Sequence, residues 1–64
     1  MTTKEFRQKL KEMGWNYIAK RESTYIQGLA IVYKNKQEVE KQTRLCDELN
    51  ELIDEYVNTP IEER

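Results

Sequence analysis

Residues 35–58, NKQEVEKQTRLCDELNELIDEYVN, carry the strongest hydrophobic pattern of the chain and decide the fold that we predict. Apolar side chains recur there at intervals of seven residues, in the pairs Val39–Cys46, Cys46–Ile53, Leu45–Leu52 and Leu49–Tyr56. This spacing places them on one face of an α-helix. We therefore predict a helix of about 20 residues, roughly 30 Å long.

The first part of this segment has a second interpretation. Residues 34–42, KNKQEVEKQ, are also compatible with a hairpin turn and a further strand, which would delay the helix to near Arg44. The spacing back to Val39, together with a capping box from Asn35 to Glu38, favours the long helix. On that helix Cys46 lies on the apolar face, so we expect its thiol to be buried and unreactive.

A shorter helix is predicted near the N-terminus, over residues 2–14, TTKEFRQKLKEMG. Phe6, Leu10 and Met13 recur at i, i+4 and i+7 and form one apolar stripe. Thr2 and Glu5 have the spacing of a capping box. Gly14 is placed to end the helix in the left-handed conformation.

Between the helices, residues 15–35 are rich in aromatic and β-branched side chains. Alternation over residues 15–20 predicts a half-buried strand, and residues 24–33 predict a second β segment. Gly28 marks either a bulge in one long strand or, as Gln27-Gly28, a tight turn between two short strands. Two or three strands are thus possible, and we favour a hairpin with an irregularity at Gly28.

The predicted fold is a single α+β domain over residues 1–64, with a helix, a hairpin of two or three antiparallel strands and a long C-terminal helix in two layers. A chain of 64 residues buries only about 60% of the surface that its unfolded form exposes. Such a thin core favours self-association, so we expect a possible homodimer.

The segment VNTPIEER, residues 57–64, is predicted to end the long helix. Proline disfavours the α conformation in the residue before it, so Asn58-Thr59-Pro60 is a stop signal. We expect residues 59–63 to form one turn, with Ile61 folding back onto the core.

Composition argues against catalysis. The chain has no histidine and one cysteine, which excludes an internal disulfide and the usual zinc ligand sets. There is no Gly-rich phosphate loop, and the commonest general base is missing. We therefore predict a protein that is not an enzyme and uses no metal or cofactor.

No apolar run reaches the roughly 20 residues that span a membrane, and the N-terminal segment has no apolar signal region. The lone cysteine fits a reducing compartment. We expect a cytoplasmic protein without membrane contact.

Charge is divided between the two halves of the sequence. Residues 1–36 have a balance of +5 and residues 37–64 a balance of −6, within a net charge of −1. Like charges at i, i+4 and acids near a helix C-terminus are both unfavourable, so stability alone does not explain the acidic half. We predict that it binds a protein partner through Asp47, Glu48, Glu51, Asp54 and Glu55.

The alternative is direct nucleic-acid binding by the basic half. Its candidate residues are Lys4, Arg7, Lys11, Lys20 and Arg21. Tyrosines of the β region would add stacking surfaces. The acidic pI of about 5.4 argues against a dominant phosphate-binding surface.

Two stretches resemble small uncharacterised proteins of phages and prophages of Gram-positive bacteria. They are Lys4-Glu5-Phe6 with Gly14-Trp15 and Tyr17-Ile18, and the ending from Tyr56 to Arg64, which contains a TP-x-x-ER motif. The resemblance implies a phage or prophage context and no particular activity. In that context the partner would be a host or phage protein. The charge asymmetry then predicts a small binding protein that masks a host nucleic-acid-handling protein, since carboxylate rows can occupy phosphate sites.

The N-terminal third, KEFRQKLKEMGWNYIAKREST, is also similar to the start of HicA-type toxin ribonucleases. Where that family has its catalytic histidine, this chain has Glu22, Ser23, Thr24 and Tyr25. The resemblance therefore implies a related fold without ribonuclease activity.

Overall fold

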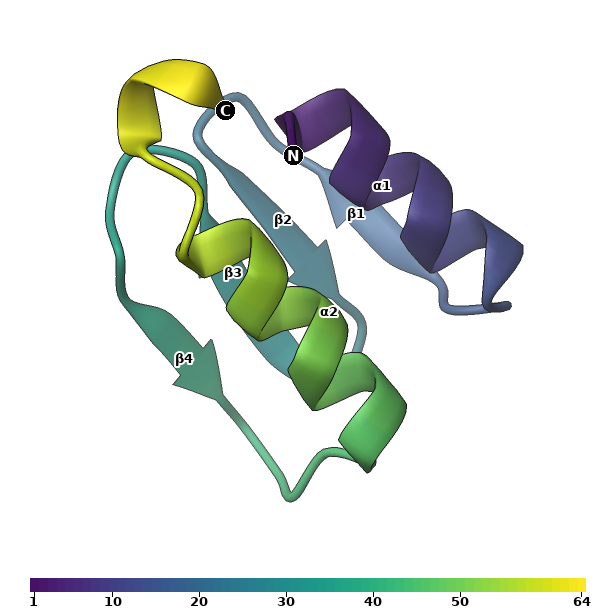
Figure 1. The fold of residues 1–64 in the computed structure, drawn as a ribbon. Coiled ribbons are helices and arrows are strands. Elements are labelled where there is room, and N and C mark those ends of the chain that lie inside the picture. The colour runs from purple at the N-terminus through teal and green to yellow at the C-terminus, as the bar shows by residue number, and fades with distance from the viewer.

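The computed structural model describes residues 1–64 and shows two helices on one face of an antiparallel sheet (Figure 1). The strand order is β1-β2-β3-β4. The elements are α1 (Thr3–Glu12), β1 (Tyr17–Ala19), β2 (Ser23–Ile26), β3 (Ala30–Tyr33), β4 (Val39–Lys41), α2 (Asp47–Val57) and a 3-10 turn, η1 (Ile61–Glu63). The predicted α+β class is confirmed. Neither helix is both long and apolar enough to cross a bilayer.

Helix α1 begins and ends where the sequence predicts. The Thr2 N–H donates to Glu5 Oε1 over 2.9 Å, and the Glu5 N–H donates to Thr2 Oγ1 over 3.1 Å. These two bonds complete the capping box. Gly14 follows the C-cap with a φ of +85°, which a residue with a Cβ adopts only at a cost.

The sheet has one strand more than the highest number that we expected. Gln27-Gly28 forms a tight turn between β2 and β3, with Gly28 at a φ of +74°, and the Leu29 N–H closes the turn on the Ile26 carbonyl. The preferred hairpin with an irregularity at Gly28 is therefore wrong. The other interpretation of Gly28, as part of a turn between two short strands, is correct.

The fourth strand also corrects the long helix. Residues 39–41 form β4, which pairs with β3 through Val39↔Val32, Glu40↔Ile31 and Lys41↔Ala30. Helix α2 has 11 residues and begins at Asp47, so the alternative of a further strand before the helix is correct. Pairing with β3 gives these residues backbone hydrogen-bond partners and covers an edge that would otherwise be open. Cys46 is exposed just before α2, which contradicts the expected buried thiol.

The core fills the space between the helices and the sheet. Its side chains come from α1, β2, β3 and α2, and from Leu45, which precedes α2. The buried apolar residues are Phe6, Leu10, Ile26, Ala30, Val32, Leu45, Leu49, Leu52, Ile53 and Tyr56. Between the helices, Tyr56 stacks on Phe6 with ring centroids 4.4 Å apart and an interplanar angle of 11°.

Helix α2 ends at Val57, as predicted, but the turn that follows does not cover the core. Ile61 is 40% exposed, so the expectation that it folds back onto the core is wrong. Arg64 has the anchoring role instead. Its guanidinium donates to the Val57 carbonyl over 2.6 Å and to the Lys36 carbonyl over 2.7 Å, and it lies 5.0 Å from the centre of the Tyr56 ring.

The face of the sheet opposite the helices has no covering layer (Figure 1). One side chain from each strand forms a row across it, in the order Ile18, Tyr25, Ile31 and Glu40. Ile18 is 42% exposed. This face combines apolar side chains with one acid at the β4 end of the row.

Candidate functional site

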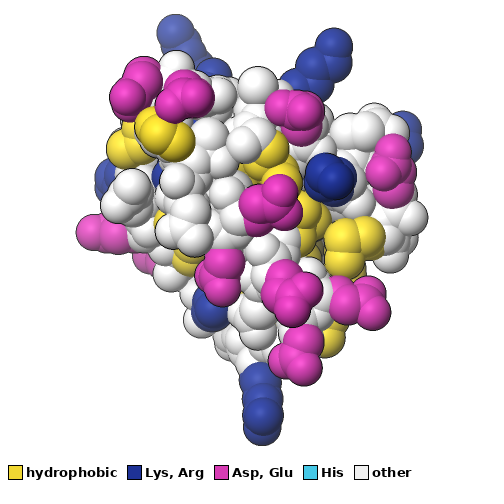
Figure 2. Space-filling view, in the orientation of Figure 1, with side chains coloured by type: hydrophobic (Ala, Val, Ile, Leu, Met, Phe, Trp, Pro, Cys, Tyr) yellow, Lys and Arg dark blue, Asp and Glu magenta, His cyan; other side chains and the backbone are white.

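The five acidic residues predicted to bind a partner are all exposed on α2 or at its start. Figure 2 shows carboxylates gathered over this helix, with hydrophobic atoms between them. They divide into two groups. Glu48, Glu51 and Glu55 face a groove beside α1, whereas Asp47 and Asp54 do not line it.

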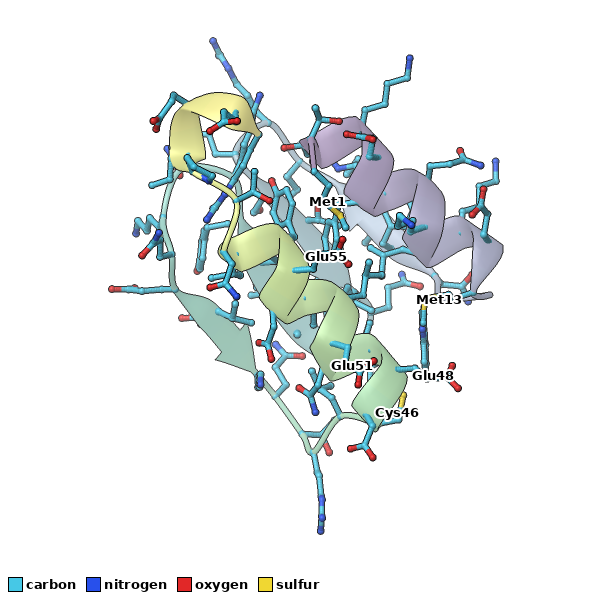
Figure 3. The ribbon with its side chains drawn as sticks, in the orientation of Figure 1. Met1, Met13, Cys46, Glu48, Glu51 and Glu55 are labelled. Carbon is cyan, nitrogen blue, oxygen red and sulfur yellow. The ribbon has the colours of Figure 1, made fainter.

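The groove between the helices has a volume of about 270 Å³. Its apolar part comes from Leu52 of α2 and from Met13, which follows α1 and is 38% exposed. Figure 3 shows Glu48, Glu51 and Glu55 along α2, with Met13 beside Glu48. An apolar floor with carboxylates along one wall suits a lysine or arginine side chain, whose stem is apolar and whose tip is charged. We refer to Met13, Glu48, Glu51, Leu52 and Glu55 as the acidic groove.

The far wall of the acidic groove is less negative. It is formed by Lys9 and Glu12 of α1, and these two charges balance each other. The excess negative charge therefore comes from α2 alone.

The negative C-terminal end of α2 is complemented by a charge from outside the helix. The last turn of α2 contains no basic residue, so nothing on the helix itself complements its negative C-terminal end. The guanidinium of Arg64 supplies that charge by donating to the Val57 and Thr59 carbonyls. Asp47 and Glu51, one turn apart, still repel each other.

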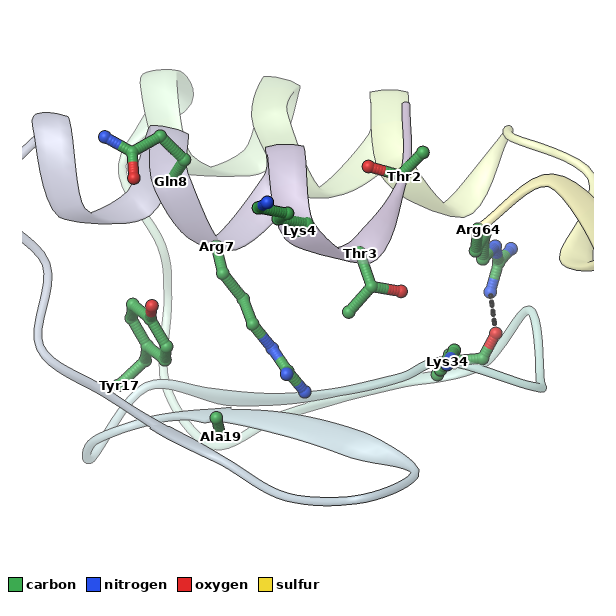
Figure 4. Close-up of a pocket in the computed structure, with 9 residues that line it drawn as sticks. All are labelled: Thr2, Thr3, Lys4, Arg7, Gln8, Tyr17, Ala19, Lys34 and Arg64. Carbon is green, nitrogen blue, oxygen red and sulfur yellow. Dashed lines mark hydrogen bonds between the residues drawn. The ribbon is translucent and has the colours of Figure 1, made fainter.

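The basic candidates gather only in part. Lys4 and Arg7 line a cleft of about 520 Å³ between α1 and β1, and Lys34 and Arg64 join them there (Figure 4). We refer to these four residues and the space between them as the basic cleft. Lys11 does not line it.

Two of the predicted basic residues lie at the β1–β2 turn. Lys20 follows β1, and Arg21 lines a neighbouring hollow of about 300 Å³ that also contains Lys34 and Glu22. The turn therefore lies near the basic cleft, but neither Lys20 nor Arg21 lines it.

Arg7 is held in place by the sheet. Its Nε donates to Thr24 Oγ1 over 2.9 Å, and its Nη2 donates to the Lys20 and Ser23 carbonyls over 2.9 and 3.0 Å. These bonds tie α1 to the β1–β2 turn. The remaining nitrogen, Nη1, forms no hydrogen bond within the chain, and Arg7 is one of the residues that line the cleft.

The tyrosines of the uncovered sheet face have partners of their own. The Tyr25 hydroxyl accepts the Gly28 N–H over 3.1 Å, and the Lys36 ammonium lies 5.0 Å from the centre of the Tyr33 ring. Desolvation raises the pKa of Tyr33, and the nearby Glu40 carboxylate raises it further. The Tyr33 ring is therefore engaged within the chain, whereas for Tyr25 only the hydroxyl has a partner.

No group of three His, Cys, Asp or Glu side chains is placed to hold a metal ion. The indole N–H of Trp15 is buried without a hydrogen-bond partner. It does not line the acidic groove or the basic cleft. The prediction that the chain is not an enzyme stays a prediction.

Sequence reasoning missed Lys34, Arg64 and Met13. Lys34 and Arg64 reach the basic cleft from segments far from α1 in the sequence, so no local pattern indicates their proximity. The only signal for Arg64 was its place in the TP-x-x-ER motif. Met13 was predicted to belong to the core stripe, but it lies at the end of α1 and borders the acidic groove.

Comparisons with protein families, with curated proteins and with solved structures find no match to this chain. The resemblances to phage proteins and to HicA-type toxins therefore stay predictions.

Proposed function

We propose that this protein acts by binding another protein through the acidic groove. The observation that carries the proposal is the pairing of an apolar floor, Met13 and Leu52, with the carboxylates of Glu48, Glu51 and Glu55. Such a surface fits a basic segment that inserts a lysine or arginine between the two helices. Asp47 and Asp54 extend the negative surface outward and would steer that segment towards the groove.

The partner that best matches this chemistry is a host or phage protein that handles nucleic acid, because its phosphate-binding surface is basic. Carboxylates in a row would compete with phosphates for that surface. The resemblance to phage proteins supports this context. The cytoplasmic location predicted from the sequence is compatible with it.

A titration with a defined probe tests the proposal. A Lys-rich peptide of about 12 residues is added to ¹⁵N-labelled protein, and amide shifts are followed by NMR. We expect the largest shifts at Met13, Glu48, Leu52 and Glu55. The triple variant Glu48→Gln/Glu51→Gln/Glu55→Gln should bind at least about tenfold more weakly.

The control removes the same number of exposed carboxylates elsewhere, as Glu22→Gln/Glu62→Gln/Glu63→Gln. It should retain most of the affinity if position matters as well as charge. Equal losses in the two triple variants would reject the acidic groove as the binding surface.

The basic cleft favours a second function, nucleic-acid binding. Its support is the convergence of Lys4 and Arg7 with Lys34 and Arg64 and the absence of Asp and Glu among the residues that line it. A gel-shift assay with single- and double-stranded DNA and RNA at 50 and 200 mM salt tests this function. Phosphate contacts require the affinity to fall steeply with salt. No shift at the lower salt concentration would exclude it.

We also infer that the chain can pair with a second copy through the uncovered sheet face. The row from Ile18 to Glu40 has its acid at the β4 edge. On the same face, strand alternation places Lys20 at the β1 edge. A two-fold axis parallel to the strands would lay the β4 edge of one copy over the β1 edge of the other. Each Glu40 would then lie opposite Ile18 of the second copy, with Lys20 two residues further along the chain and within reach of a long side chain.

A further inference from the structure

We propose that the basic cleft is a binding site for a phosphate monoester, the group found at the end of a nucleic-acid strand or on a mononucleotide. The proposal rests on the nucleic-acid-binding function proposed above and narrows its ligand from the phosphate backbone to a terminal phosphate. It does not depend on the acidic groove.

Charge is the first argument. Every ionisable side chain of the lining that is charged at neutral pH is a cation, namely Lys4, Arg7, Lys34 or Arg64. Thr2 and Thr3 at the start of α1 also line this space, but their N–H groups already donate to Glu5 Oε1 and to the main-chain oxygen of Arg64, so the positive charge comes from the four side-chain cations. A cleft of one sign concentrates counter-ions of the other sign.

Preorganisation is the second argument. Arg64 directs Nε, Nη1 and Nη2 to backbone carbonyls, and Arg7 bonds two backbone carbonyls and the Thr24 hydroxyl, which fixes both guanidinium groups without neutralising them. Arg7 lines the cleft and its Nη1 has no hydrogen-bond partner within the chain, so this nitrogen can still donate to a ligand. A group whose rotamer is already fixed loses little entropy when it binds a ligand. Lys4 and Lys34 are exposed and can close on the ligand from opposite sides.

Shape is the third argument. The floor of the cleft includes Tyr17 and Ala19 of β1, whose side chains face α1 (Figure 4). A tyrosine ring provides a surface for a base or sugar next to the phosphate. The volume of about 520 Å³ lies within the usual range for small-ligand sites.

The cation count favours a monoester over a backbone diester. A monoester carries between about −1.5 and −2 charges at neutral pH and three terminal oxygens that accept hydrogen bonds. A diester carries one charge and two such oxygens. The two exposed lysines and the unpaired Nη1 of Arg7 match the higher charge and the three terminal oxygens of the monoester.

Calorimetric titration with matched ligands tests the proposal at one fixed salt concentration. The ligands are dT₅ with a 5′-phosphate, dT₅ with a 5′-hydroxyl, thymidine 5′-monophosphate, thymidine and inorganic phosphate. We expect 5′-phosphorylated dT₅ to bind at least about tenfold tighter than its hydroxyl form, because the added group supplies charge-assisted hydrogen bonds. If thymidine monophosphate binds as tightly as phosphorylated dT₅, the ligand is a mononucleotide. If it binds more weakly, the ligand is a strand end.

Two charge-matched variants complete the test. Lys4→Gln/Lys34→Gln removes the mobile cations of the cleft, and Lys9→Gln/Lys11→Gln removes the same charge from α1 outside it. The first should abolish the advantage of the 5′-phosphate, and the second should leave it within about twofold. Equal binding of the two dT₅ forms would overturn the monoester site while leaving nucleic-acid binding intact. No binding of any ligand would overturn both.

Discussion

The hydroxyl of Tyr56 lies 2.6 Å from Oγ1 of Thr3, and both residues are buried. This hydrogen bond joins the first turn of α1 to the last turn of α2. The ring that carries the hydroxyl stacks on Phe6, and the Arg64 guanidinium lies near its centre. Tyr56 thus connects both helices to the segment that follows α2.

Tyr56→Phe should lower the free energy of unfolding by about 1–2 kcal/mol, because the Thr3 hydroxyl loses its buried partner. The ring and its stacking on Phe6 are retained. Urea denaturation followed by the fluorescence of Trp15 measures the change. A double-mutant cycle with Thr3→Val should give a coupling energy of about 1 kcal/mol. A coupling near zero would show that the hydrogen bond contributes nothing.

Arg64→Ala should lower the free energy of unfolding by about 3 kcal/mol. The guanidinium bonds the carbonyls of Tyr33, Lys34, Lys36, Val57 and Thr59, and truncation leaves several of them without a donor. In a domain of this size, such a loss lowers the melting temperature by at least about 12 °C. Arg64→Lys should not rescue it, because an ammonium cannot reproduce the planar fork.

Arg44→Ala provides the control for Arg64, since Arg44 is an exposed arginine that makes no hydrogen bond to the rest of the fold. It should change stability by no more than about 0.5 kcal/mol. Similar losses in both variants would contradict the anchoring role of Arg64.

Acid should weaken α1 through Glu5. Hydrogen bonds from Thr2, first from its backbone and then from its side chain, lower the pKa of Glu5 below the usual value of 4.5. A lowered folded pKa means that the carboxylate stabilises the fold above pH 4.5 and that this stabilisation is lost as the pH falls through the folded value. Unfolding at pH 7, 5, 4 and 3 should therefore show a steeper loss for the natural chain than for Glu5→Gln. Parallel pH profiles would refute the assignment.

Cys46→Ser should stabilise the protein by about 0.5–1 kcal/mol. Cys46 occupies the N-cap position of α2 with extended backbone angles, yet its side chain makes no capping hydrogen bond. Serine is among the preferred N-cap residues because its hydroxyl accepts an N–H of the first turn. Cys46→Ala is the comparison, and it should show no gain. Thermal unfolding distinguishes the two.

An exchange of charge tests self-association through the sheet. If the Lys20 side chain of one copy reaches Glu40 of the other, Lys20→Glu should weaken the dimer because it places two acids near each other. Lys20→Glu/Glu40→Lys should restore it. Light scattering over a range of protein concentrations gives the dissociation constants. A chain that stays monomeric at millimolar concentration would remove the dimer from consideration.

Much of α1 and the end of α2 could be read from the sequence because their signals are local. The capping box joins residues three apart, Gly14 acts at its own φ angle, and Pro60 restricts its own neighbour. Each requires no knowledge of the rest of the fold. The same is true of the apolar residues of α2, whose spacing marks Leu49, Leu52, Ile53 and Tyr56 as one buried face.

The candidate site could be predicted only in part. Residues 47–55 are close in sequence, so their shared negative surface could be expected. The groove itself could not be predicted from α2 alone, because it also contains Met13, which follows α1. The basic cleft could not be predicted from a local pattern, because Lys34 and Arg64 are 30 and 60 residues from Lys4 along the chain.

The amino-acid sequence by itself determined the α+β class, the ends of α1, the stop after Val57 and the buried face of α2. Tertiary structure decided the rest. Val39 and Cys46 satisfy a helical spacing by residue type, yet β3 has an edge whose N–H and C=O groups need partners, and residues 39–41 meet that need. The place of Arg64 follows from carbonyls that converge from separate loops. Hydrogen bonds between distant segments depend on the folded geometry, and a linear pattern does not encode them.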